Sequence, residues 1–160
     1  MAPDITIHPT RPDHPLVAAM LADLDRYLMS LYAPEENHIL GAPALLAPDV
    51  DFLAAWLGGE AVGCGAMRRM PGDGRTPDQR YGEIKRMYVT PKLRGQRLAE
   101  RLLIELEGTL RSEGIGAAML ETGNKQHEAV RLYERCGYAK RAIFGAYSEN
   151  GMSVFDAKAL

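Results

Sequence analysis

Two separated stretches of the sequence hold residue types that could bind a phosphorylated ligand and move protons. The first is Glu83–Ala99, in which an apolar strand pattern ends at Pro91 and a helical pattern begins near Leu98. A helix start offers unpaired backbone N–H groups and the positive end of the helix dipole, and Gly95 allows close backbone approach. The basic side chains here are Lys92, Arg94 and Arg97. The stretch therefore predicts a pyrophosphate cradle, with a basic helix start that only faces solvent as the alternative.

The second stretch is Glu128–Tyr138, which reads EAVRLYERCGY. Its helical pattern carries Leu-Tyr-Glu and ends at Gly137. Tyr133 is the chemically interesting residue here, because a tyrosine hydroxyl can donate a proton. A core aromatic on an amphipathic helix is the alternative interpretation.

Together the two stretches resemble the GNAT family of acyl-CoA-dependent N-acetyltransferases. The first is similar to the family's motif A, Arg/Gln-x-x-Gly-x-Gly/Ala, and the second to its motif B, a helix with Leu-Tyr-Glu before Gly-Phe/Tyr. The resemblance covers nearly the whole chain. It implies transfer of an acetyl group from acetyl-CoA, without a metal, to a primary amine of a small molecule or protein. The amine would attack directly in a ternary complex.

The resemblance implies contacts to acetyl-CoA. The strand residues that match the pantetheine-binding positions are Met87, Tyr88 and Val89. The loop residues that match the pyrophosphate-binding amides are Arg94, Gly95, Gln96, Arg97, Leu98 and Ala99. The chain departs from the family twice. Arg97 stands where motif A has a glycine, and Gln126 stands where many members have a ligand-binding asparagine.

The resemblance also implies catalytic roles. Tyr133 matches the tyrosine that protonates the departing thiolate, and Glu83 matches the strand glutamate that acts as general base in yeast-type histone acetyltransferases. A strand amide such as that of Met87 could stabilise the oxyanion. The alternative for Glu83 is a structural carboxylate paired with Lys85 or Arg86.

The acceptor side is harder to assign. A polar cluster in a proline-rich loop and the end of a later strand supply candidates: Glu36, Asn37, His38, Glu121 and Thr122. Acidic groups there would suit a cationic amine, although solvated loop residues are the alternative. Phe144 and Tyr147 could line the pocket, and we expect no fixed structure over residues 146–151.

Elements must position these residues. Alternation and apolar runs predict strands near residues 5–7, 51–57, 61–67, 81–89, 117–121, 138–142 and 152–158. Helical spacing predicts helices from Pro15 to about Tyr32, from 98 to about 110, and over 126–135, with Asp13 capping the first. Glu107 and Arg111 are expected to form a favourable i,i+4 pair on the helix that begins at 98. The expectation is one α/β domain over residues 1–160, with a mixed, mainly antiparallel central sheet of six to seven strands flanked by helices.

Length, composition and charge limit the class of protein to which this chain can belong. The chain has 160 residues, 46% of them hydrophobic, and a net charge of -2, which suits one soluble domain and argues against a dedicated nucleic-acid binder. Two isolated cysteines, Cys64 and Cys136, argue against a disulfide framework. No run of about 18 apolar residues predicts a membrane span, and no signal peptide is evident. We expect a cytoplasmic protein, and the family's frequent dimers leave a homodimer open.

Two other functions stay open at this point. The same fold could use a different acyl-CoA. It could also serve as a catalytically weak CoA-binding sensor or interaction module, for which the arginine at position 97 is the only support in the sequence.

Overall fold

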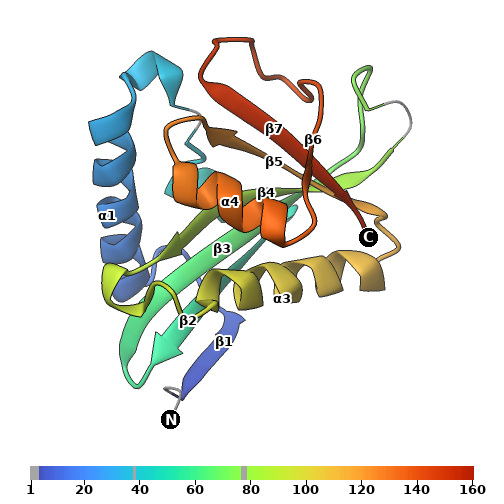
Figure 1. Ribbon diagram of the computed structural model, residues 1–160. Coiled ribbons are helices and arrows are strands. Elements are labelled where there is room, and N and C mark those ends of the chain that lie inside the picture. The colour runs from blue at the N-terminus through green and yellow to red at the C-terminus, as the bar shows by residue number, and fades with distance from the viewer. Residues whose placement is uncertain (1–3, 38, 77–78) are drawn as a thin grey trace. The chain divides into compact units, whose positions relative to one another are not determined.

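One mixed sheet of seven strands runs through the computed structural model, which describes residues 4–37, 39–76 and 79–160 (Figure 1). The strands are β1 (Ile5–Pro9), β2 (Val50–Leu57), β3 (Glu60–Met70), β4 (Tyr81–Val89), β5 (Ala117–Gly123), β6 (Ala139–Lys140) and β7 (Ser153–Ala159). Their order in the sheet is β1-β2-β3-β4-β5-β7-β6. β4 and β5 pair in parallel, whereas β1 with β2, β5 with β7 and β6 with β7 pair antiparallel. The predicted mixed sheet is confirmed.

The helices in the described part of the chain are α1 (Pro15–Leu31), α2 (Ala42–Leu45), α3 (Leu98–Ser112) and α4 (His127–Arg135), with 3-10 turns η1 (Pro34–Glu36) and η2 (Pro91–Leu93). Both bounds of β4 agree with the prediction, because Pro91 ends the strand pattern there. Two predicted strands differ most in length from the observed ones. β3 continues three residues past the predicted end, to Met70, and β6 is only two residues long.

The chain divides into two compact units. The first unit consists of residues 1–67 and 85–106, and the second of residues 68–84 and 107–160. Strands β3 and β4 and helix α3 contribute residues to both. The expectation that residues 1–160 act as one domain stays a prediction.

In the first unit, helices cover both faces of the strands. Val17 and Met20 of α1 belong to a buried cluster with Ala54 of β2. The neighbouring Ala55 belongs to a second cluster, with Leu102 of α3. Successive strand residues point to opposite faces, so α1 and the start of α3 pack on opposite sides of β2.

The start of α1 differs from the prediction. His14 is the N-cap, and its Nδ1 accepts a hydrogen bond from the Leu16 amide at 3.2 Å. Asp13 is instead paired with Arg11, whose Nη2 lies 2.8 Å from Asp13 Oδ2. Pro15 occupies the first turn, where its missing N–H costs nothing.

In the second unit, β5 and β7 lie side by side over seven register pairs, from Ala117↔Ala159 to Gly123↔Ser153 (Figure 1). A buried aromatic cluster packs on these strands. It contains Tyr81, Phe144 and Phe155 together with Met119. Phe144 belongs to an irregular segment between β6 and β7, yet it is fully buried.

Glu107 on α3 forms the predicted i,i+4 pair with Arg111, but its carboxylate is buried at 2% exposure and has closer partners. The Tyr138 hydroxyl donates to Glu107 Oε2 at 2.8 Å, and Lys158 Nζ lies 2.9 Å from Oε1. The Arg111 guanidinium is farther away, at 3.9 Å. A buried carboxylate needs such donors, because removing an unpaired charge from water is costly.

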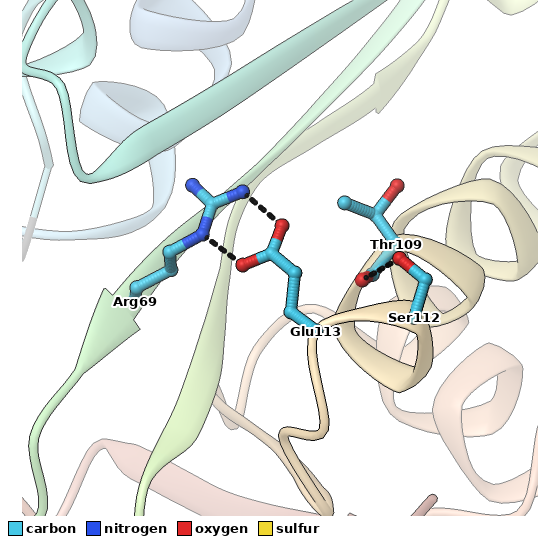
Figure 2. Close-up of polar contacts among 4 residues, drawn as sticks. All are labelled: Arg69, Thr109, Ser112 and Glu113. Carbon is cyan, nitrogen blue, oxygen red and sulfur yellow. Dashed lines mark hydrogen bonds and ion pairs between the residues drawn. The ribbon is translucent and has the colours of Figure 1, made fainter.

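The C-terminal end of α3 is tied to β3 by a two-pronged ion pair (Figure 2). Both Nε and Nη2 of Arg69 lie 2.6 Å from the carboxylate oxygens of Glu113. This hydrogen bonding lowers the pKa of Glu113. Nearby, the Ser112 hydroxyl donates to the Thr109 carbonyl at 2.7 Å, and the same carbonyl also accepts from the Glu113 amide at 3.2 Å (Figure 2).

The packing of β4 against α3 in the second unit gives a stability prediction. A Cβ at Gly82 would overlap the methyl groups of Leu110, which is fully buried. We expect Gly82→Ala to lower the free energy of unfolding by about 1–3 kcal/mol, because overpacking strains the core. Urea denaturation measures this change.

Gly108→Ala is the matched control. No atom lies within 4 Å of a Cβ at Gly108, which is exposed on α3. There we expect a gain of about 0.5–1 kcal/mol, because alanine favours the helix. Equal stabilities for Gly82→Ala and the unchanged protein would show that Leu110 yields without cost.

Candidate functional site

The burial of strand β4 changes along its length. Residues 81–84 are buried, residues 85–88 are half-buried, and Val89 is buried again. An internal strand of a sheet covered on both faces is normally buried throughout. The half-buried stretch includes Met87 and Tyr88, two of the positions predicted to bind the pantetheine arm.

Arg86 interrupts the regular strand. Its φ is 57°, a left-handed conformation that costs an ordinary L-residue about 1–2 kcal/mol. Two contacts hold it in place: Arg86 Nη1 lies 2.6 Å from Asp25 Oδ1 on α1, and Cys64 Sγ donates to the Arg86 carbonyl at 3.2 Å. The Arg86 side chain is only 5% exposed. This strand distortion is therefore anchored to α1 and β3.

Cys64 itself is chemically quiet. It is fully buried, and burial raises the pKa of its thiol to about 12. A thiol with so high a pKa is a poor nucleophile near neutral pH, because the thiolate is the reactive form. Cys64 acts here as a small core residue with a hydrogen bond to the strand.

The loop after β4 is exposed but fixed at its base. Arg94 Nε donates to the Val89 carbonyl at 3.1 Å, and its guanidinium lies 5.8 Å from the centre of the Tyr88 ring. Leu93 beneath it is buried. Residues 94–97 are exposed, and Gly95 has a φ of 79°. The loop thus presents its backbone to solvent.

The backbone conformation of Arg97 explains how an arginine can stand where motif A has a glycine. Its φ is 61°, in the left-handed region that glycine enters freely. The Arg101 amide donates to the Arg97 carbonyl at 3.1 Å, which is the first turn of α3. The amides of Leu98, Ala99 and Glu100 have no acceptor within the helix, because they precede this bond. The shape of an anion-binding helix start is therefore kept without the glycine.

Tyr133 lies on α4 and is 7% exposed. Its ring meets Tyr138 edge-on, with centroids 5.8 Å apart. Burial raises the pKa of Tyr133 well above its usual value, and the charges of Asp156, Cys136 and Glu121 raise it further. The hydroxyl therefore stays protonated near neutral pH and can act as a proton donor.

Glu83 is a buried carboxylate on β4, with 5% exposure. It accepts a hydrogen bond from the Tyr147 hydroxyl. Burial, the Glu83 charge and this hydrogen bond raise the pKa of Tyr147 far above its usual value. The sequence named Tyr147 only as a pocket-lining candidate. Its role as the donor to Glu83 carried no sequence signal, because 64 residues separate the two.

The acceptor-side candidates in the first unit stabilise their own loop. Glu36 Oε1 accepts a hydrogen bond from the Ala33 amide at 2.8 Å, which caps η1. Asn37 Nδ2 donates to the Ala33 carbonyl at 3.4 Å. His38, the third candidate of this cluster, lies outside the described residues. Binding of an acceptor by this loop stays a prediction.

In the second unit, Gln126 folds back on the preceding loop. Its Oε1 accepts hydrogen bonds from the Gly123 amide at 3.1 Å and from the Thr122 hydroxyl at 3.5 Å. Thr122 is buried, and Glu121 beside it is half-buried. This unit also holds Glu83 and Tyr133, whereas residues 87–89 and 94–99 belong to the first unit.

The described residues contain neither a cluster of potential metal ligands nor a helix suited to cross a membrane. No three His, Cys, Asp or Glu side chains gather there as a potential metal site. None of the helices in the described ranges combines the length and the apolar character that crossing a membrane requires.

The sequence of this chain is similar to those of known acetyltransferases. The family model of the acetyltransferase (GNAT) family matches residues 17–138. An IAA acetyltransferase of Azospirillum brasilense is 40% identical over 158 residues, 99% of each chain.

Solved structures of other proteins share the fold of this chain. A crystal structure from Klebsiella pneumoniae subsp. pneumoniae, of a protein named as a candidate acyl-CoA N-acyltransferase, is 36% identical over 98% of each chain, with a TM-score of 0.80. PaiA N-acetyltransferase of Thermoplasma acidophilum, solved with coenzyme A, covers 100% of both chains with a TM-score of 0.73 at 16% identity, which shows the shared fold.

The Arg97 conformation generates a prediction. If the backbone shape matters more than the guanidinium, Arg97→Gly changes the Kd for CoA by less than about fivefold, since an exposed charge contributes little. Arg97→Val weakens binding at least about tenfold, because a β-branched residue resists the left-handed region. Isothermal titration with CoA measures both variants. Equal losses in the two would show that the guanidinium itself binds the ligand.

Proposed function

The chain belongs to the GNAT family of acetyltransferases, and we propose that it acetylates a primary amine with Glu83 as general base and Tyr133 as general acid. Acetyl-CoA is its cosubstrate, and acyl-CoA-dependent N-acetyl transfer is its reaction class. The proposal concerns the acceptor and the residues that carry the chemistry. The observation that carries it is the buried, tyrosine-bound carboxylate of Glu83 on β4.

An amine is protonated near neutral pH and must lose a proton before its nitrogen can attack a thioester carbonyl. A carboxylate is suited to accept that proton, directly or through a water molecule. Burial makes an ionised Glu83 costly unless a donor supports it, and the Tyr147 hydroxyl is such a donor. These contacts support Glu83 as the base.

Attack by the amine forms a tetrahedral oxyanion and then releases the CoA thiolate. The Met87 amide, in the half-buried part of β4, is a candidate donor to the oxyanion. Tyr133 is protonated near neutral pH and can transfer its proton to the thiolate sulfur. Glu83 then releases its proton to solvent and Tyr133 takes one up from solvent, which closes the cycle.

For the donor, the proposal places the pyrophosphate at the helix start after Arg97 and the pantetheine arm along residues 87–89. The exposed loop, the left-handed residues at 95 and 97, and the open helix amides support this assignment. The site residues named from the sequence stay predictions in this respect.

For the acceptor, the proposal is a primary amine of a small molecule or protein. IAA is tested beside the amines because a relative carries it in its name. Glu35 and Glu36 in the first unit are acidic groups that could attract a cationic amine. We also propose a cytoplasmic location, which the two free cysteines support. A homodimer stays a prediction.

Thiol release from acetyl-CoA tests the function directly. The purified protein is assayed against IAA and a panel of amines, polyamines, amino acids and peptides. Turnover with one acceptor class names the substrate. CoA binding without turnover across the panel would favour another acyl donor or a sensor role, and acetyl-CoA would then be replaced by longer acyl-CoAs.

Tyr133→Phe tests the acid. We expect kcat to fall at least about tenfold while the Kd for CoA stays unchanged, because the ring is kept and only the proton donor is lost. Tyr27→Phe removes an exposed tyrosine hydroxyl on α1 and serves as the control. Full turnover in Tyr133→Phe would remove this residue from the mechanism.

A further inference from the structure

The irregular segment of residues 141–147 is held rigidly against the second unit's core. Phe144 is fully buried and meets Tyr81 and Phe155 edge-on, with centroid distances of 5.5 and 5.6 Å. The Tyr147 ring packs on the same cluster, 5.6 Å from Phe144 and 5.5 Å from Phe155. The tyrosine ring is therefore seated among other aromatic rings and not free in a loop.

Two arginines fix the backbone of this segment. Arg75 Nη1 donates to the Tyr147 carbonyl at 2.7 Å and to the Gly145 carbonyl at 3.4 Å. In return, Arg141 Nη2 donates to the Arg75 carbonyl at 2.8 Å. The loop that carries Arg75 is itself closed, because Asp73 Oδ1 accepts from the Arg75 amide at 2.7 Å. We call Arg75 and Arg141 the arginine clamp.

The arginine clamp holds the backbone of the segment that carries Tyr147. The Tyr147 hydroxyl donates to Glu83 Oε2 in the core. The hydrogen bond spans the sequence from β4 to the C-terminal segment. A seated ring and a fixed carbonyl leave the hydroxyl little freedom, so the Glu83 carboxylate is held in one orientation. This is the arrangement that a general base requires, because its geometry sets the efficiency of proton transfer.

We propose that Tyr147 is a positioning residue for the reaction, whose hydroxyl holds the Glu83 carboxylate aligned to take the proton of the acceptor amine. The inference rests on the proposed role of Glu83 as base. The step is a simple proton transfer: an N–H bond of the ammonium breaks, and an O–H bond forms on the carboxylate. The arginine clamp acts through Tyr147 and touches no reacting atom.

The electrostatic surroundings fit this role. The titratable groups that act on Tyr147 include Glu83, Glu121 and Tyr81, and those that act on Tyr81 include Glu83, Asp73, Arg141 and Arg68. Burial raises the pKa of Tyr81 to about 12, and the pKa of Tyr147 is raised further by burial and the Glu83 charge. Both tyrosines stay protonated across the pH range of an assay, so Tyr147 remains a donor throughout.

Tyr147→Phe tests the proposal, because it keeps the ring packing and removes only the hydroxyl. The readout is the acidic limb of the pH profile of kcat/KM, which reports the essential base in the free enzyme. Without the donor the charged carboxylate is less favoured, so we expect this limb to move to higher pH by about one to two units. The loss of kcat/KM is then about tenfold or more below the limb and shrinks as pH rises. KM for acetyl-CoA stays within about twofold.

Tyr138→Phe is the matched control. Tyr138 is another buried tyrosine that donates to a buried carboxylate, Glu107, at 2.8 Å. Its loss should lower the thermal stability and leave the acidic limb where it was. Equal shifts in both variants would mean that any buried tyrosine hydroxyl moves the profile, which overturns a specific role for Tyr147.

Arg75→Met tests the clamp with the hydroxyl still present. Arg75 is exposed, so the variant is expected to fold. We expect a smaller shift of the acidic limb in the same direction. An unmoved limb would overturn the clamp's part in positioning Tyr147.

Glu83→Gln distinguishes a failure of the Tyr147 inference from a failure of Glu83 as the general base. If Glu83→Gln abolishes the acidic limb and the limb of Tyr147→Phe coincides with that of the unchanged protein, the inference fails and the base assignment stands. If Glu83→Gln keeps full turnover, the base assignment itself fails. Adding Tyr147→Phe to Glu83→Gln should cost nothing further, since both changes act on one proton transfer.

Discussion

The distortion of β4 at Arg86 is the constraint on which the candidate site depends. A non-glycine residue in the left-handed region is strained, and the chain offsets that strain with the ion pair to Asp25 and the hydrogen bond from Cys64. The distortion lies within the part of the strand that is half-buried, Lys85 to Tyr88, whereas the strand is buried up to Ile84. One strand can therefore supply a buried carboxylate and, a few residues later, an accessible backbone.

In the loop of residues 94–97, the backbone conformation of a glycine is reached by an arginine. Arg97 has the φ that a glycine would adopt, and α3 begins directly after it. The predicted phosphate contacts are made by backbone amides, so they need this left-handed geometry and no particular side chain. Arg94 uses its side chain differently, as a brace between the loop and the end of β4.

The second unit buries carboxylates among aromatic rings and pairs each of them with a hydrogen-bond donor. Glu83 and Glu107 are both nearly inaccessible, and each receives a tyrosine hydroxyl. Glu107 also binds Lys158, which makes it a structural ion pair. The Tyr138 ring that serves Glu107 packs against Tyr133, so the orientation of the candidate acid is tied to this buried network.

Local pattern was enough to predict much of this protein from its sequence. The bounds of β4, the start of α3 at Leu98 and the α4 helix follow from apolar periodicity, proline and glycine, all of which act over a few residues. The two motifs and the family followed for the same reason, because they are short and contiguous. The α1 cap was wrong, since Asp13 found a closer partner in Arg11.

Only the tertiary structure decided which polar residues are buried and what each contacts. The i,i+4 pair of Glu107 with Arg111 followed from the sequence, but the burial of Glu107 did not, and Tyr147 lay in a segment expected to lack fixed structure. Their hydrogen-bonding partners are 31 and 64 residues away in the sequence. Hydrogen bonds and ion pairs between distant segments leave no periodic trace in a sequence, because they depend on where the fold brings the chain back. The sequence by itself determined the elements and the family, and the fold determined the partners of Glu83, Arg86 and Glu107.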